Sequence, residues 1–190
     1  MKLDATSGQD ILRCRYKNIW MFTIKEGYTI KSNNHINGTS QLWQKIWGAK
    51  HWPKVEHFLW LLSHRKVLTW DQLQKRGMEG PSIWKMCKEN TQSIEHLFNT
   101  CSKAEQLWQN INTIFRQTDR NMRNINETIL KWWKGGYKSE VLNKAWRLSI
   151  GFLLWEIWKE RNHKIFREET KDINHIWKVI LDNIRERIIL

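Results

Sequence analysis

The sequence of 190 residues is poor in cysteine, proline and long apolar runs, and each shortage excludes a class of protein. Three cysteines form no even disulfide framework, and they fit a reducing compartment. Two prolines leave long stretches uninterrupted, as helices require. The most apolar stretch, Trp146–Trp158, is too short to span a bilayer and contains Arg147 and Glu156. It therefore predicts a buried helix.

The sequence also lacks the motifs that carry common catalytic chemistry. It has no P-loop, no dinucleotide fingerprint, no G-x-S-x-G elbow and no H-E-x-x-H zinc motif. Its N-terminus has no apolar run of the secretory kind. We therefore expect a non-enzymatic, intracellular protein, with the nucleus, the cytoplasm and the mitochondrion all open as its compartment.

Acidic residues are scarce relative to basic ones, which gives the chain a formal net charge of +13. Such a balance favours anionic partners, for example nucleic acid. The excess is +5 over residues 1–50, +3 over residues 51–130 and +5 over residues 131–190. Because the charge is spread evenly, it supports weak, salt-sensitive attraction and does not by itself specify a nucleic-acid site.

Tryptophan is abundant, with fourteen residues in the chain. Each one offers a large apolar surface and one N–H group that needs a partner when it is buried. We therefore expect most of these side chains to lie in the core or against a partner.

The hydrophobic spacing beyond Ser40 is helical. It predicts helices over residues 40–47, from Pro53, after Thr69, from Ser102, through 129–133, over about 139–166 and over about 172–189. Residues 19–32 are instead rich in aromatic and β-branched types around Glu26-Gly27, which favours a short β-hairpin or extended element. The predicted fold is mainly α. We expect an extended or β segment of residues 1–39 to pack on a compact multi-helix domain of residues 40–190, so that the two parts form one structural unit.

The spacing also predicts helix caps and inward faces. Thr69 with Gln72, and Ser102 with Glu105, fit the pattern of a capping box. The side chains expected to face inward are Val55, Phe58, Leu59 and Leu62; Leu107, Trp108, Ile111, Ile114 and Phe115; Leu142, Ala145, Trp146, Ser149, Phe152 and Leu153; and Ile173, Ile176, Trp177, Ile180, Leu181, Ile184 and Ile188.

One stretch, KMCKENTQSIEHLFNTC, has the spacing of a zinc knuckle that lacks one ligand. Cys87, His96 and Cys101 are spaced Cys-x8-His-x4-Cys. A closed structural zinc site has four ligands and usually begins with Cys-x2-Cys. Trp84 stands where the first cysteine of such a pair would be.

Five blocks in this order resemble the reverse-transcriptase zinc-binding domain of plant non-LTR retroelements. They are GYTIKS, LWQKIW, PKVEHFLWLLSHRKVLTWDQLQKRG, EHLFNTCSKAEQLW and LLWEIWKERNHKIF, within roughly residues 10–170. That domain follows a polymerase and often precedes a ribonuclease H region. The chain resembles neither, since it has no Asp-Asp pair and no room for such domains. The resemblance therefore implies a detached fragment of a mobile-element protein.

The resemblance also implies roles for the knuckle residues. Cys87 matches the second thiol, His96 the imidazole and Cys101 the last thiol, while Trp84 takes the place of the first thiol. Indole does not bind zinc, so we expect no stable zinc and Trp84 packed into the space of the metal. Structural zinc held by three ligands and an unforeseen fourth, such as Cys14, stays open as the alternative.

Two kinds of partner fit the remaining features. Nucleic acid is one, because basic residues alternate with aromatic ones in LKWWKGGYK and follow a basic loop; the candidates are Arg116, Arg120, Arg123, Lys131, Lys134 and Lys138. Protein, including a second copy of the chain, is the other and is preferred. It would bind the apolar end of the last helix, with Trp177, Ile180, Ile184 and Ile188 as candidates. The ancestry also suggests an antagonistic, toxic factor.

Overall fold

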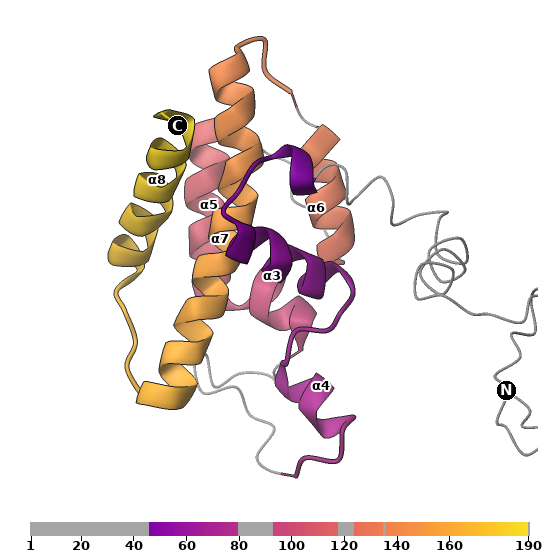
Figure 1. Cartoon of the computed structure of the whole chain (residues 1–190). Helices are drawn as coiled ribbons and strands as arrows, with labels where there is room; N and C mark the ends of the chain where they lie inside the picture. Colours follow the sequence, from indigo (N-terminus) through magenta and orange to yellow (C-terminus); the bar gives the residue numbers. More distant parts are fainter. Residues whose placement is uncertain (1–45, 80–92, 118–123, 135, 190) are drawn as a thin grey trace, which may run out of the picture. The chain divides into compact units, whose positions relative to one another are not determined.

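The computed structural model describes residues 46–79, 93–117, 124–134 and 136–189, which form a set of packed helices (Figure 1). Within these ranges there are helices and no strand. The elements are α3 (Pro53–Ser63), α4 (Trp70–Gln74), a π-helical turn η1 (His96–Thr100), α5 (Ser102–Phe115), α6 (Ile125–Lys134), α7 (Glu140–Arg167) and α8 (Ile173–Ile189). The mainly α prediction is confirmed. The predicted β element and most of the first predicted helix lie outside the described residues.

Helix α7 is the centre of the described fold. It packs against α3, α5, α6 and α8, and Figure 1 shows α8 running alongside it. Residues 148–154 are all buried in succession, which requires neighbours on every side of the helix. The buried helix expected at Trp146–Trp158 is therefore confirmed. No helix in the described ranges is long and apolar enough to cross a membrane.

Helix α3 follows its sequence pattern closely. Pro53 stands in the first turn, where the missing N–H has no helical partner to lose. The four side chains predicted to face inward, Val55, Phe58, Leu59 and Leu62, are the buried residues of this helix. The apolar spacing alone therefore identified the buried face of α3.

Two details of the predicted helices are corrected by the structure. Helix α5 begins one residue earlier than a Ser102 cap allows: Cys101, in an extended conformation, is the N-cap, and no side chain caps this end. The π-helical turn ends at Thr100 and has Cys101 as its C-cap, so this residue lies at the boundary between η1 and α5. Ile114 and Leu142, both predicted to face inward, are 53% and 48% exposed: Ile114 lies at the edge of the apolar stripe of α5, and Leu142 lies in the first turn of α7.

A pair of tryptophans joins α6 to α7. The rings of Trp132 and Trp146 stack with centroids 3.8 Å apart and planes within 6°. Trp132 Nε1 donates to the Trp146 carbonyl at 2.9 Å, and Trp146 Nε1 donates in return to the Trp132 carbonyl. Phe115 and Tyr137 pack edge-on against Trp146. Both indole N–H groups of this pair thus have the hydrogen-bond partner that their burial requires.

A buried histidine joins the start of the described domain to α7. His51 is 2% exposed, and its Nε2 donates to the Leu148 carbonyl at 3.1 Å. Its ring lies edge-on to Phe152 and fills the space above Gly151. Burial lowers the pKa of His51 from 6.5 to about 4, helped by the nearby Arg187 and opposed by the Leu148 hydrogen bond. His51 is therefore neutral in the folded chain near pH 7.

This histidine predicts a loss of stability in mild acid. The pKa is lower in the folded chain than in the unfolded chain, so between these two values the unfolded chain binds more protons. As far as His51 is concerned, the free energy of unfolding is highest above pH 6.5 and declines as the pH falls toward 4. From pH 7 to pH 5 we expect the free energy of unfolding to fall by about 2 kcal/mol from this group.

Urea unfolding of the full chain at both pH values measures this change. The exposed His57 provides the matched control: His57→Gln should keep the acid-dependent loss, whereas His51→Gln should remove most of it. An unchanged pH dependence in His51→Gln would contradict the prediction.

Candidate functional site

The second half of the predicted knuckle is a tightly packed turn between helices. His96, Leu97, Phe98 and Asn99 are all buried within η1, and Cys101 is 1% exposed. His96 Nδ1 lies 3.2 Å from Thr100 Oγ1, and the Cys101 N–H donates to the His96 carbonyl at 2.8 Å. Trp108 Nε1 donates to the Phe98 carbonyl at 2.8 Å. This turn is therefore anchored to α5 by an indole as well as by its own backbone.

Glu95, which directly precedes His96, connects three elements. Its Oε1 accepts from Arg65 Nη1 at 2.7 Å, just beyond α3. Its Oε2 accepts from the Ile125 N–H at 2.9 Å, at the start of α6, and from Asn99 Nδ2 at 3.4 Å. A carboxylate at a helix N-terminus is stabilising. The position of Glu95 is thus explained by its role in holding helices together.

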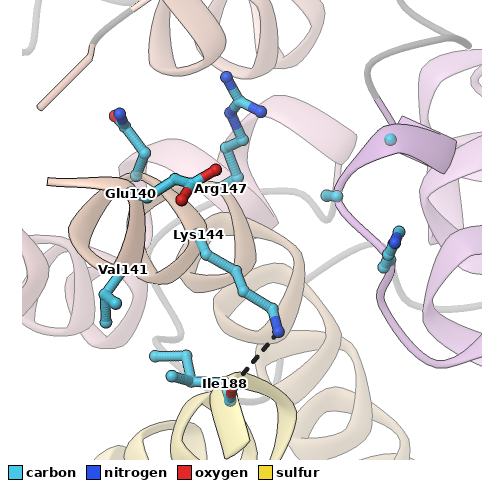
Figure 2. A pocket seen from close by; sticks show the side chains of 9 residues that line it. Glu140, Val141, Lys144, Arg147 and Ile188 are labelled. Atoms are coloured by element: carbon cyan, nitrogen blue, oxygen red, sulfur yellow. Dashed lines mark hydrogen bonds between the residues drawn. The ribbon is translucent and has the colours of Figure 1, made fainter. Parts of the chain in front are cut away.

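A hollow of about 500 Å3 lies in another part of the described fold, between the turn at Gly48–Lys50, the start of α7 and the end of α8 (Figure 2). We call this hollow the basic groove. Its lining consists of Gly48, Ala49, Lys50, Glu140, Val141, Asn143, Lys144, Arg147 and Ile188. These residues include three cations and one carboxylate, several aliphatic side chains and no aromatic ring.

Two hydrogen bonds hold the walls of the basic groove together. Lys144 Nζ donates to the Ile188 carbonyl at 3.3 Å, and Figure 2 shows this side chain reaching from α7 to the last turn of α8. Arg187 Nε donates to the Lys50 carbonyl at 2.6 Å. Sequence reasoning missed this groove, because its walls come from opposite ends of the domain and no local motif marks them.

Two comparisons with known proteins bear on the chain. Residues 22–108 match the family described as zinc-binding in reverse transcriptase. The family resemblance predicted from the sequence is confirmed. A protein of Arabidopsis thaliana named "Putative ribonuclease H protein" is 21% identical over 171 residues, which are 88% of this chain and 27% of that protein. No solved structure matches the chain.

These matches support a chain derived from a plant retroelement. The reverse-transcriptase zinc-binding match ends at Trp108, whereas the resemblance in the sequence extends to about residue 170 and the Arabidopsis relative covers most of the chain. The chain spans about a quarter of the length of that relative. The knuckle, η1 and the start of α5 therefore lie inside the family match, and the basic groove combines residues from inside it and beyond it.

The described part of the zinc-binding segment contains two of the three predicted ligands. His96 and Cys101 are nitrogen and sulfur donors of the kind that zinc prefers, whereas Cys87 and Trp84 lie outside the described residues. Within the described ranges, no three His, Cys, Asp or Glu side chains lie together in a group that could hold a metal ion. Zinc binding, and the packing of Trp84 in place of the metal, both stay predictions.

The candidate nucleic-acid residues are only partly described. Arg116, Lys131 and Lys138 are exposed, whereas Arg120, Arg123 and the side chain of Lys134 lie outside the described part. Arg116 and Lys138 are brought to one end of the fold, because the Tyr137 hydroxyl donates to the Phe115 carbonyl at 2.5 Å. The aromatic residues described in the same stretch, Trp132 and Tyr137, pack against Trp146.

The apolar stripe of the last helix is used within the chain. Ile176, Ile180 and Ile184 are buried where α8 packs against α5 and α7. Of the predicted interaction residues, Ile180 and Ile184 thus lie in the core, while Trp177 and Ile188 are half-buried. Residues 148–154 of α7 are buried in succession, so the middle of this helix offers apolar surface to neighbours on several sides. Binding of a partner through Ile180 or Ile184 would require α8 to leave the bundle, whereas Ile188 also lines the basic groove.

Proposed function

We propose that this chain is a non-catalytic, retroelement-derived helical protein that acts by binding another protein. The basic groove carries the proposal, because it is concave, lined by aliphatic and cationic side chains, and framed by three separate segments. Exposed apolar surface of this kind is typical of partner sites. An antagonistic outcome of the binding, and the cellular compartment, stay predictions that come from ancestry and composition.

A non-catalytic role is supported by the contacts of Glu95. This carboxylate is the one that stands beside the predicted zinc ligand His96, where a general base would be useful. Both of its oxygens already accept hydrogen bonds from Arg65, Asn99 and the N-terminus of α6. Such a carboxylate serves the packing of three elements, and a role as a proton acceptor would require it to release them.

Nucleic acid is the second candidate, supported by the net charge and by exposed Arg116, Lys131 and Lys138. Single strands are held by free aromatic faces together with cations. In the basic stretch, however, the Trp132 ring is covered by Trp146, and Tyr137 packs against Phe115 and Trp146. The described surface there offers phosphate contacts and no free indole, which favours a protein partner.

Cross-linking of the full chain in cells distinguishes the two partner classes. We expect adducts of defined mass that survive treatment with nucleases, since the partner is a protein. With purified chain, binding to single-stranded RNA and DNA should be weak and should fall by roughly tenfold or more on a severalfold increase in salt, as for non-specific phosphate contacts. Adducts that disappear after nuclease treatment would overturn the proposal in favour of nucleic acid.

A further inference from the structure

The basic groove has a marked excess of positive charge for its size. Lys50, Lys144 and Arg147 line it, and Glu140 is the one carboxylate among the lining residues that the structure describes. An ammonium group has three N–H donors, and Lys144 uses one of them for the Ile188 carbonyl. A concave wall with charges of one sign concentrates the field inside it. The groove therefore attracts an anionic group.

The cationic side chains stand on a fixed frame. Arg187 holds the carbonyl of Lys50, and Lys144 holds that of Ile188, so the turn, α7 and α8 are tied together around the groove. Positive charge at the end of α8 also compensates the partial negative charge of a helix C-terminus. The backbone that carries these cations is thus pre-organised, which lowers the entropic cost of binding an anion.

The apolar part of the groove determines what kind of anion fits. Ala49, Val141 and Ile188 are aliphatic, and Val141 is 58% exposed. Beside the lining residues in sequence, Trp47, Leu142 and Ile189 are also exposed. Aliphatic surface matches leucine, isoleucine or valine side chains. Nucleic-acid bases would instead require a ring to stack on, and the described lining residues include none; the exposed Trp47 is next to them in sequence and not among them.

We propose that the basic groove binds an acidic segment of a partner protein, which places its carboxylates against Lys50 and Arg147 and its aliphatic side chains against Val141 and Ile188. The inference rests on the proposed protein-binding function and specifies the chemistry of the partner. The hollow of about 500 Å3 lies within the roughly 300–1,000 Å3 typical of ligand sites.

A labelled peptide with glutamate and leucine in a helical pattern, about 14 residues or four turns long, is the probe. Its binding to the full chain is measured by fluorescence anisotropy at low and physiological salt. The same peptide with lysine in place of glutamate, and a uridine oligonucleotide of similar length, are measured in parallel. We expect the acidic peptide alone to bind at both salt concentrations.

Matched variants test whether the groove is responsible. The Lys50→Glu/Arg147→Glu variant should weaken binding of the acidic peptide by about tenfold or more, since two attractive charges become repulsive. The Lys75→Glu/Lys178→Glu variant changes the net charge equally at exposed positions outside the lining and should alter binding less than about twofold. Val141→Asp should weaken binding similarly, whereas Ile114→Asp, equally exposed on α5, should not.

Three results with the purified chain would overturn the proposal: no binding of the acidic peptide by the unaltered chain, equal losses in both charge variants, or oligonucleotide binding that the Lys50→Glu/Arg147→Glu variant alone loses. Circular dichroism confirms that each variant is folded. If cellular protein adducts persist in the Lys50→Glu/Arg147→Glu variant, the protein-binding function stands and the groove is not its site. If nuclease removes the adducts of the unaltered chain, the proposed function itself fails.

Discussion

Replacing Trp146 with alanine is expected to lower the free energy of unfolding by about 4–5 kcal/mol, at the upper end for a buried tryptophan. The substitution removes a ring that stacks on Trp132 and packs against Phe115 and Tyr137. It also leaves the Trp132 carbonyl buried without the N–H that it accepts from Trp146. Because the free energy of unfolding of a domain is only about 5–15 kcal/mol in total, about a third of the stability or more should be lost.

Urea unfolding of the full chain measures this effect. With a slope of about 2 kcal/mol per M, the midpoint should fall by roughly 2 M. Trp146→Phe keeps an aromatic ring and removes the hydrogen bond, so it should cost about 1–3 kcal/mol, the desolvation penalty of an unsatisfied buried group. Trp47→Ala is the control at a 51% exposed tryptophan, where the midpoint should hardly change. Equal losses for Trp47→Ala and Trp146→Ala would contradict the prediction.

The contrast among tryptophans shows what composition could and could not predict. Composition indicated that most indoles would lie in the core or against a partner; among those whose exposure the structure describes, Trp108, Trp132 and Trp146 are buried, Trp47 is exposed and the others are half-buried. It could not indicate that Trp132 and Trp146 exchange hydrogen bonds, because the exchange depends on where α6 meets α7. Tryptophan alternates with lysine around Trp132, which is typical of a nucleic-acid surface, yet Trp132 lies in the core.

Periodicity predicted the helices and their apolar faces because those properties are local. The inward face of α3 needed only the spacing of four side chains. What covers Ile180 and Ile184 could not be predicted in this way. Spacing identified their apolar stripe, but only tertiary packing decides whether a stripe meets another helix of the chain or a partner. Here α5 and α7 cover it.

The candidate sites were predictable to different degrees, because local spacing is visible in the sequence and tertiary packing is not. The knuckle residues His96 and Cys101 are close in sequence and carry a recognisable spacing. The basic groove joins Lys50, Arg147 and Ile188, which are distant in sequence and unremarkable in their local context. Glu95 lies between these cases: its place beside His96 is visible in the sequence, whereas its bond to the start of α6 is not.

Gly151 is expected to tolerate no larger side chain, and Gly151→Ala should lower the free energy of unfolding by about 3 kcal/mol, as severe overpacking does. An added Cβ would lie 2.1 Å from His51 Nε2 and within 2.8 Å of two ring carbons. His51 has little room to move, since it is 2% exposed and bonded to the Leu148 carbonyl. The clash therefore outweighs the gain of about 1 kcal/mol that alanine normally gives over glycine inside a helix.

A double-mutant cycle, measured by urea unfolding, tests whether the clash with His51 causes this loss of stability. In the His51→Ala background the clash is removed, so Gly151→Ala should become neutral or stabilising, with a coupling energy of about 2–3 kcal/mol for two residues in contact. Gly48→Ala is the matched control, because its Cβ would meet nothing within 4 Å; it should be neutral or slightly stabilising. If Gly151→Ala costs the same with and without His51, the close approach of this histidine is not what requires the glycine.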